Sequence, residues 1–278
     1  MAAPGVIRER PNVIGALGGL LWLLVTIVPV YYLVLTSLRR QQAYYAENPL
    51  LPPAAPTLGA YRLVLENDFL RYLTNSVIVT VVAVALVLAT SLMASYYLVR
   101  SGSRLSRGVL SVVLLGLAIP VQATIVPVYY LIVRLGLYDS LFALILPAVA
   151  FAIPISVLII VNFVRDIPAE LFESMHADGA GHWRILHSLV LPLSRPALVT
   201  VGVYEALQVW NGFLFPLILT QSSSVRVLPL SLWTYQGQFA VNVPAVLAAV
   251  TLSALPVLAA YIVGRRQIVS GLTAGFGK

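Results

Sequence analysis

The sequence predicts an all-α integral membrane protein with six transmembrane helices, and three observations lead to this prediction. Hydrophobic residues make up 60% of the 278 residues and charged residues only 10%, whereas about a quarter of the residues of a soluble domain are charged. The apolar residues form runs of about 20 to 25, enough for a helix to cross a hydrocarbon core of ~30 Å. The net charge is +7, from 17 basic and 10 acidic residues. The basic residues lie at the ends of the apolar runs, where membrane orientation places them.

The six runs can be assigned in order along the chain. After a short polar segment, residues 1–12, the first run ends in polar residues and two arginines rather than at a small-residue cleavage site, so we expect a retained span and not a signal peptide. A proline-rich connection with a short helix over residues 58–66 follows it. The spans are predicted at residues 13–38, 72–99, 109–133, 141–164, 197–219 and 245–263. Residues 13–265 then form one six-helix transmembrane domain, and residues 266–278 a tail.

The distribution of basic residues predicts the orientation. Six spans place both termini on one side of the membrane. Eleven basic residues then fall on the side of the termini and six on the other, and four of those six share one longer loop. Because cytoplasmic loops carry the excess of Lys and Arg, we expect both termini and the loop 165–196 in the cytoplasm.

Prolines within the spans indicate helices that line an interior. Pro120 and Pro127 are seven residues apart, as are Pro147 and Pro154, so each pair is expected to kink its helix on one side. The carbonyl groups that proline leaves unpaired need partners, which favours a bundle interior or a water-filled cavity over bare lipid. Proline is also common in membrane helices generally, so a transport role and an ordinary packing role both stay open.

The fifth predicted span carries the most informative polar residues. At helical spacing Glu205, Gln208, Gly212 and Phe215 share one face, with Trp210 and Asn211 beside it. An acid at mid-span costs ~3 kcal/mol on insertion scales and normally faces a cavity or a partner. This face either lines a translocation path or subunit interface, or holds a hydrogen-bonded acid that joins helices. The translocation-path candidates are Glu205, Gln208, Asn211 and Gly212.

The segment 167–196 differs from the rest of the chain because it mixes acids, bases, aromatics and glycines. Pro168 suits the first turn of a helix, where its missing N–H costs nothing. Leu171, Phe172 and Met175 then share one helical face, and Gly179 suits a left-handed C-terminal stop. A second amphipathic piece follows. We expect a protrusion that another protein grips.

Residues for catalysis or metal binding are sparse. The three histidines, His176, His182 and His187, are six and five residues apart and do not stack on one helical face, so no metal site is predicted. There is no glycine-rich loop followed by Lys, hence no phosphate site in this chain. We expect neither an enzyme nor a cofactor bound by this chain.

The same segment resembles the cytoplasmic loop of binding-protein-dependent ABC importer permeases of the carbohydrate-uptake type. Ser174 and Met175 stand where that family has alanines. Other similarities run through essentially the whole chain, and the tail GLTAGFGK resembles that of the smaller permease of maltose-type importers. In the loop the matching residues are Glu173, Asp178, Gly179, Ala180, Leu191, Pro192 and Pro196; elsewhere they are Asn75, Ser76, Ile119, Pro120, Pro127, Gly136, Leu137, Trp210, Asn211, Pro256 and residues 271–275.

The resemblance implies a type I ABC importer permease architecture and a set of partners. These are a homologous second permease, two cytoplasmic ATPase subunits that hold ATP and Mg, and an extracytoplasmic binding protein, all at a bacterial cytoplasmic membrane. The residues implied in ATPase coupling are Glu170, Leu171, Phe172, Glu173, Met175, Asp178, Gly179 and Ala180, with Glu173 expected to pair with an ATPase Arg. Those implied in binding-protein contact are Trp233, Tyr235, Gln236 and Gly237.

The cargo implied by the resemblance is a sugar or oligosaccharide. The lack of basic residues within the spans argues against a strongly anionic cargo. Three alternatives stay open at this point: the same machinery importing a polyol, a glycerol phosphate or another small solute, a secondary carrier or channel driven by an ion gradient, and an assembly protein with no cargo.

Overall fold

The computed structural model describes residues 12–235 and 241–274, and it is helical along almost all of this length, with no β-strand in the described part. The all-α prediction is therefore confirmed. The helices are α1 (Val13–Ser37), α2 (Gln41–Tyr44), α3 (Gly59–Glu66), α4 (Phe69–Ser101), α5 (Arg104–Leu115), α6 (Ile125–Arg134), α7 (Leu141–Arg165), α8 (Ala169–Ala177), α9 (His182–Ile185), α10 (Leu191–Leu193), α11 (Arg195–Trp210), α12 (Leu214–Leu219), α13 (Leu228–Ser231) and α14 (Val243–Ala274). Short 3₁₀ turns η1 (Gly116–Ala118), η2 (Val121–Thr124), η4 (Ser223–Val225) and η5 (Leu232–Tyr235), and a π-helical turn η3 (Leu186–Val190), join them.

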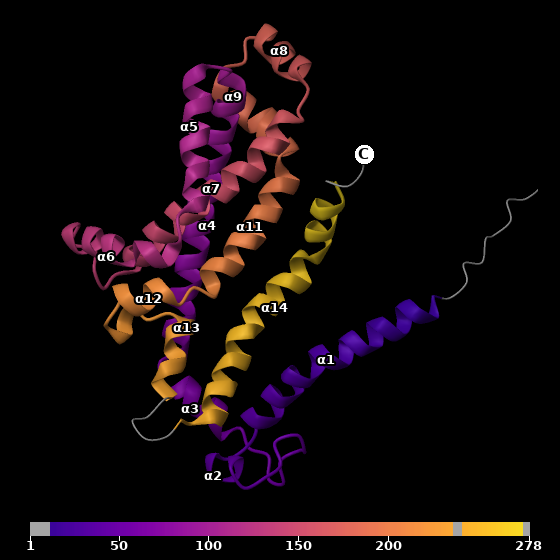
Figure 1. The fold of residues 1–278 in the computed structure, drawn as a ribbon, viewed down its shortest axis with the longest axis vertical. Helices are drawn as coiled ribbons and strands as arrows, with labels where there is room; N and C mark the ends of the chain where they lie inside the picture. The colour runs from indigo at the N-terminus through magenta and orange to yellow at the C-terminus, as the bar shows by residue number, and fades with distance from the viewer. Residues whose placement is uncertain (1–11, 236–240, 275–278) are drawn as a thin grey trace, which may run out of the picture. The chain divides into compact units, whose positions relative to one another are not determined.

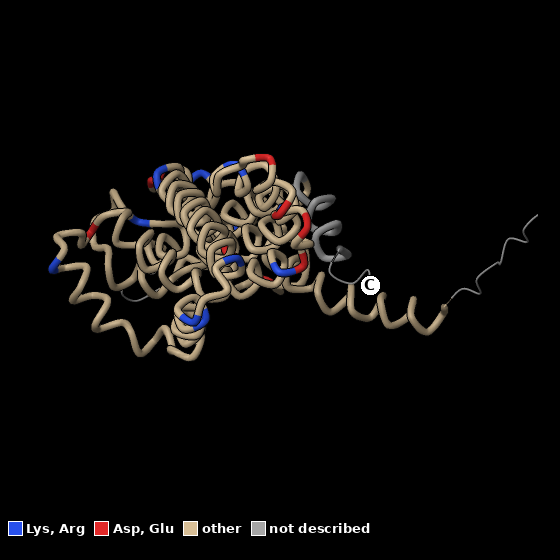
Figure 2. Tube along the Cα trace, turned by 90° about the horizontal axis from the view of Figure 1, so that it is seen from above, with Lys and Arg blue, Asp and Glu red and all other residues tan. Residues whose placement is uncertain are grey.

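Four single helices are long and apolar enough to cross a membrane. They are α1, α4, α7 and the part of α14 from Val243 to Ile262, and they correspond to the first, second, fourth and sixth predicted spans. Two bent helix pairs raise the number of candidate spans from four to six if each pair is counted as one span. Charged residues are few along the trace, which is drawn without charge colour over most of its length (Figure 2).

The third predicted span, residues 109–133, is not one helix. Its segments Arg104–Ala118 and Val121–Arg134 meet at 97°. Ile119 is extended, with φ −84° and ψ 114°, which is the conformation that a following proline imposes. Pro120 then cannot donate a backbone hydrogen bond to continue the helix. The helix is therefore interrupted at Ile119-Pro120, where only a kink was expected.

The fifth predicted span, residues 197–219, is also interrupted. α11 ends at Trp210, where the Asn211 side chain donates to the Leu207 carbonyl at 2.8 Å, and α12 begins at Leu214. The N–H of Gly212 bonds to the Val209 carbonyl at 3.1 Å, and a Cβ at Gly212 would lie 3.1 Å from that same oxygen. Before α11, the helical segment His182–Leu193 is bent from it by 74°.

The described chain forms two compact units. One contains α1 to α3 and the start of α14, up to Leu252. Arg39 holds the connection after α1 together and is 1% exposed. It forms an ion pair with Glu47 at 2.8 Å and donates hydrogen bonds to the carbonyls of Asn48 and Leu51. The two terminal nitrogens of this buried guanidinium thus bond to three residues of the proline-rich connection that the sequence predicted.

The other unit runs from Asp68 to Thr234, with the rest of α14 from Ser253. In it α4 packs along α7, and α11 packs against both. Figure 1 shows α8 and α9 at one end of this bundle and α12 and α13 toward the other. Two apolar clusters mark these ends. One includes Tyr96, Phe172 and Ile185, and the other includes Val79, Leu144 and Leu219.

Candidate functional site

The helix α8 begins and ends as its sequence predicts. Pro168 precedes its first residue, Ala169, and Gly179 lies just beyond its end with φ +75°. The N–H of Gly179 bonds to the His176 carbonyl, and that of Ala180 to the Met175 carbonyl, each at 2.9 Å. These two bonds close the last turn in the manner of a left-handed glycine cap, so α8 is a short helix with defined ends.

Phe172 fastens α8 to its own chain. Its side chain is fully buried and stacks on Tyr96 of α4, with ring centroids 6.3 Å apart and planes 13° apart. The Arg100 guanidinium lies over the Phe172 ring, 4.2 Å from its centroid, a cation–π contact. Phe172 was predicted to contact an ATPase subunit, and in this structure its ring is covered by α4 of its own chain. Ala180, 6% exposed, is likewise turned inward.

The remaining predicted coupling residues are open to a partner. Glu170, Leu171, Glu173, Asp178 and Gly179 are exposed, and Met175 is half-buried against the cluster around Phe172. Three carboxylates thus stand on the outer side of a helix whose inner side is held by an aromatic residue. A cationic groove is the surface that such a helix end fits electrostatically.

The three histidines take different neighbours. His176 and His182 have ring centroids 6.0 Å apart, and His187 stacks on Trp183 at 6.1 Å. His176 Nδ1 donates to the Phe172 carbonyl at 2.7 Å, and His182 Nδ1 shares a hydrogen bond of 3.1 Å with the Tyr96 hydroxyl. They therefore tie the α8–α9 corner together and to α4.

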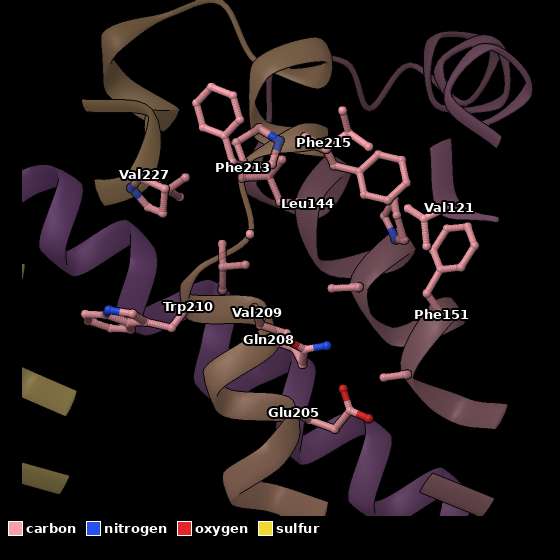
Figure 3. Close-up of a pocket in the computed structure, with 18 of the residues that line it drawn as sticks. Val121, Leu144, Phe151, Glu205, Gln208, Val209, Trp210, Phe213, Phe215 and Val227 are labelled. Carbon is pink, nitrogen blue, oxygen red and sulfur yellow. The ribbon is translucent and has the colours of Figure 1, made fainter. Parts of the chain in front are cut away.

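A cavity of about 310 Å³ opens between α7, α11 and α12. Its wall is largely apolar, with the rings of Phe151 and Phe215 stacked at 5.6 Å. Glu205 and Gln208 supply polar groups from α11, as Figure 3 shows, and Glu205 is the one charged side chain among the described lining residues. A site of this size with few polar groups in an apolar wall has the character of a small-molecule pocket.

Glu205 joins two helices at this cavity. It is 4% exposed, and its Oε1 accepts a hydrogen bond from Ser156 of α7 at 3.2 Å. Both readings of the sequence therefore have a counterpart: the acid lines a cavity and also holds helices together. Gly212 and Phe215 line the cavity too, although the helix ends before them, because the break after Trp210 turns the chain back over it.

Two residues beside this face are placed differently. Asn211 is exposed, is not among the cavity's lining residues and caps α11 with its side chain. The Trp210 ring points away from Phe151 and Phe215 (Figure 3). Asn211 therefore shapes the break in the chain, while Glu205, Gln208 and Gly212 line the cavity.

Two polar groups fix the loop that follows α12. Asp139, with φ +56°, accepts hydrogen bonds from the N–H groups of Gln221 at 2.7 Å and Ser222 at 2.9 Å, and from the Ser222 hydroxyl. These donors, chiefly the hydroxyl, hold the pKa of the Asp139 carboxyl below its usual value. Asn75 Nδ2 donates to the carbonyls of Ser224 and Arg226, both at 2.9 Å.

The predicted binding-protein contacts lie at the end of this loop. Trp233 is half exposed and packs against Phe213 with ring centroids 5.5 Å apart. Tyr235, also predicted as a binding-protein contact, is 7% exposed. Gln236 and Gly237 lie outside the described residues.

Comparison with known proteins decides the family. Residues 85–268 match the family model described as binding-protein-dependent transport system inner membrane component. The chain belongs to this family. It is thus a multi-pass membrane permease of the ABC transporter type, and the family resemblance seen in its loop is confirmed.

Relatives of this permease cover nearly its full length. A putative ABC transporter permease of Caldicellulosiruptor sp. is 41% identical over 254 residues, 91% of this chain and 92% of the relative. A diacetylchitobiose uptake system permease of Streptomyces coelicolor is 30% identical over 258 residues, 92% and 85% of the two chains. A sulfoquinovosyl glycerol transport system permease of Agrobacterium fabrum is 30% identical over 248 residues, 89% and 87%.

Solved structures share the fold of the permease. A chain of a bacterial ABC transporter involved in the import of the acidic polysaccharide alginate superposes with a TM-score of 0.81 at 22% identity, over 95% of this chain and 99% of the other. A chain of the alginate transporter in complex with an alginate pentasaccharide-bound periplasmic protein gives 0.66 at 16% identity, over 92% and 94%.

Sequence reasoning missed several residues of the permease that position these sites. Tyr96, Arg100, Ser156 and Asp139 were not singled out. Tyr96 and Arg100 stand four apart near the end of the second span, a spacing that predicts one shared face. Asp139 follows the Gly136-Leu137 pair, and Ser156 is a lone hydroxyl in an apolar helix, so only the fold reveals their partners.

Proposed function

We propose that this permease forms half of the translocation path of an ATP-driven, binding-protein-dependent importer of a sugar or oligosaccharide. A homologous second permease supplies the other half. Two cytoplasmic ATPase subunits bind ATP and Mg, and an extracytoplasmic binding protein delivers the cargo. ATP binding closes the ATPase pair, and α8 passes this movement to the bundle, which opens alternately to the two sides.

The observation that carries the proposal is the family match over residues 85–268, which contains α8 whole. The geometry of α8 supports its part in coupling. It stands at the end of the bundle, its inner side is fixed by Phe172, and its outer side presents Glu170, Glu173 and Asp178. A rigid, anionic protrusion is suited to a cationic groove on a separate subunit.

The proposal includes a topology of six spans with both termini in the cytoplasm of a bacterial cell. The two bent helix pairs then each count as one span. The basic residues support this arrangement, with eleven on the side of the termini against six on the other. α8 and its loop 165–196 then lie on the same side as the ATPase, as coupling requires.

The cavity supports an uncharged saccharide as cargo. Saccharide hydroxyls hydrogen-bond to carboxylates and amides and pack against aromatic rings, and the lining offers Glu205, Gln208 and Phe151. No Arg, Lys or His is found among the described lining residues, so an anionic sugar would leave its charge uncompensated. The relative from S. coelicolor is named for diacetylchitobiose, and this agrees with a neutral oligosaccharide.

The experiment reconstitutes the permease in liposomes with its partner permease, ATPase and binding protein. ATP hydrolysis and sugar uptake are expected only with loaded binding protein, and both should fall at least tenfold in Glu173→Lys. Arg107→Glu, a charge reversal at an exposed residue near the start of α5, serves as the control and should keep them. Normal coupled hydrolysis in Glu173→Lys would remove the role assigned to that residue.

The pathway assignment has its own test in the same liposomes. Glu205→Leu should lower uptake about 10-fold or more, the value of one hydrogen bond to a charged group, while binding-protein-stimulated hydrolysis stays within about twofold. Leu207→Ala, which changes an exposed residue outside the cavity lining, is the matched control. Unchanged uptake by Glu205→Leu would contradict a path through this cavity.

A further inference from the structure

The helix α4 differs from the other long helices of the described chain in having no interruption. It runs for 33 residues, Phe69–Ser101, and contains neither proline nor glycine. By contrast α1 contains Pro29, α7 contains Pro147 and Pro154, and α14 contains Pro256. Because sharp bends in helices occur mainly at such residues, α4 is the stiffest connection between the two ends of its unit.

At one end, α4 holds the loop after α12. Both N–H groups of the Asn75 amide are used, one on the Ser224 carbonyl and one on the Arg226 carbonyl, at 2.9 Å each. The adjacent Ser76 hydroxyl accepts the N–H of Leu228 at 2.9 Å. Asn75 and Ser76 are 7% and 3% exposed. Three hydrogen bonds from buried side chains therefore tie this loop to two successive residues of α4, a few residues before the exposed Trp233.

At the other end, α4 holds α8 and α9. Tyr96 stacks on Phe172 of α8, and its hydroxyl shares a 3.1 Å hydrogen bond with His182 of α9. Arg100, one turn further along, covers the same Phe172 ring. The coupling helix is thereby packed directly on the last two turns of α4, and its C-terminal corner is bonded to the same tyrosine.

We propose that α4 is the element that joins the outer loop to the coupling helix, with Asn75 and Tyr96 as the positioning residues at its two ends. They are 21 positions apart, a rise of about 30 Å, which is close to the thickness of the hydrocarbon core. Docking of the binding protein against the loop displaces α4 at Asn75, and the unbroken helix carries the displacement to Phe172 and α8. This inference rests on the proposed function.

The competing routes within the unit are interrupted. α11 is bent by 74° from the segment before it and ends at Trp210. The α5–α6 pair is bent by 97°. α7 leads directly into α8 but carries two prolines in its middle. Among the described helices, only α4 has side-chain hydrogen bonds to residues 224–228 at one end and ring contacts with the coupling helix at the other.

The experiment is a double-mutant cycle in the full reconstituted complex. Asn75→Asp keeps the shape of the side chain but turns an acceptor toward two carbonyls, and Tyr96→Phe keeps the ring stack but removes the bond to His182. The measured quantity is the ratio of ATP hydrolysis with loaded binding protein to hydrolysis without it. Thr74→Ala and Tyr97→Phe, neighbours that are not bonded to either site, are the matched controls.

We expect each variant to lower the ratio about 5-fold or more, with hydrolysis in the absence of binding protein within about twofold of the unchanged permease. The double variant should be no worse than the stronger single one, because both changes break one connection. Effects that multiply in the double variant, or an unchanged ratio in either single one, would overturn the inference. Absence of any stimulation in the unchanged complex would instead overturn the proposed function.

A second measurement covers variants that assemble poorly. The chain has no cysteine, so a spin label at Ser174→Cys reports on α8 alone. Loaded binding protein should change the label's spectrum in the unchanged background and leave it unchanged with Asn75→Asp. An identical spectral change in both backgrounds would show that the signal bypasses α4.

Discussion

Ser156 of α7 donates a hydrogen bond to Glu205 of α11 at 3.2 Å, and both side chains are buried. The bond lies at the wall of the cavity that we assign to the translocation path. A buried acid is costly in a membrane and needs a partner or a cavity, and here it has both. The pair therefore makes the position of α11 against α7 depend on a polar contact at the cavity itself.

This pairing predicts a non-additive effect on stability. Ser156→Ala should destabilise the permease by about 1–3 kcal/mol, because it removes the buried carboxyl's hydrogen-bond donor. Glu205→Leu in the same chain should recover part of that loss, giving a coupling of about 0.5 kcal/mol or more. Thermal unfolding in detergent measures both, and Thr200→Val, which alters a bond within α11 only, is the control. Strictly additive losses would mean that the two residues do not act together.

Substitutions at Phe172 and its neighbour Leu171 should distinguish the anchoring of α8 on its own chain from the contact of α8 with the ATPase. Phe172→Ala leaves a void beneath α8 and should cost about 3 kcal/mol, seen as a lower unfolding temperature and loss of coupled hydrolysis. Leu171→Ala changes a residue that is 41% exposed and should leave stability within about 0.5 kcal/mol while weakening ATPase binding. Equal destabilisation by the two changes would contradict the inward placement of Phe172.

Gly108 of α5 and Gly116 of the adjoining turn η1 give a matched steric test. A Cβ at Gly116 would lie 2.8 Å from Cγ of Pro154 in α7, whereas a Cβ at Gly108 meets nothing within 4 Å. Gly116→Ala should therefore cost about 1–3 kcal/mol through overpacking. Gly108→Ala should be neutral or stabilising by up to about 1 kcal/mol, since alanine favours the helix. The reverse order in thermal unfolding would show that α5 does not approach Pro154 in this way.

Asp139 predicts a pH dependence of the loop after α12. The hydroxyl of Ser222 and the N–H groups around it lower the pKa of its carboxyl, so the carboxylate's contribution to stability is present above its unfolded pKa of about 4. This contribution is lost as pH falls through the lower folded-state pKa. Asp139→Asn should be less stable than the unchanged permease at pH 7, and the difference should shrink below about pH 4. A difference in unfolding temperature that stays constant with pH would contradict this.

The sequence predicted the elements whose signals are local. The apolar runs gave four of the spans to within a few residues, and Pro168 and Gly179 bounded α8. Pro120 and Asn211-Gly212 were also noted in the sequence, but they did not predict full breaks in the two spans. The size of each bend depends on what the flanking segments pack against. Gly116 illustrates this, because its closeness to Pro154 joins residues far apart in sequence.

The candidate sites were predictable in composition but not in orientation. Helical spacing placed Phe172 with Leu171 and Met175 on one face, and only the fold shows that α4 already covers the phenylalanine. Spacing also grouped Glu205 with Gly212 and Phe215, which do meet at the cavity, although by a break in the chain and not along one helix. Partners such as Ser156 and Tyr96 needed the tertiary structure.

The central claim is that α8 contacts a separate ATPase on the cytoplasmic side, and cross-linking tests it most directly. Because the chain has no cysteine, Leu171→Cys places a single thiol on the exposed side of α8. A thiol-specific photo-cross-linker at this site should join the permease to its ATPase subunit in inverted membrane vesicles. Labelling of the thiol by a membrane-impermeant reagent in intact cells, with no ATPase adduct in vesicles, would contradict the account.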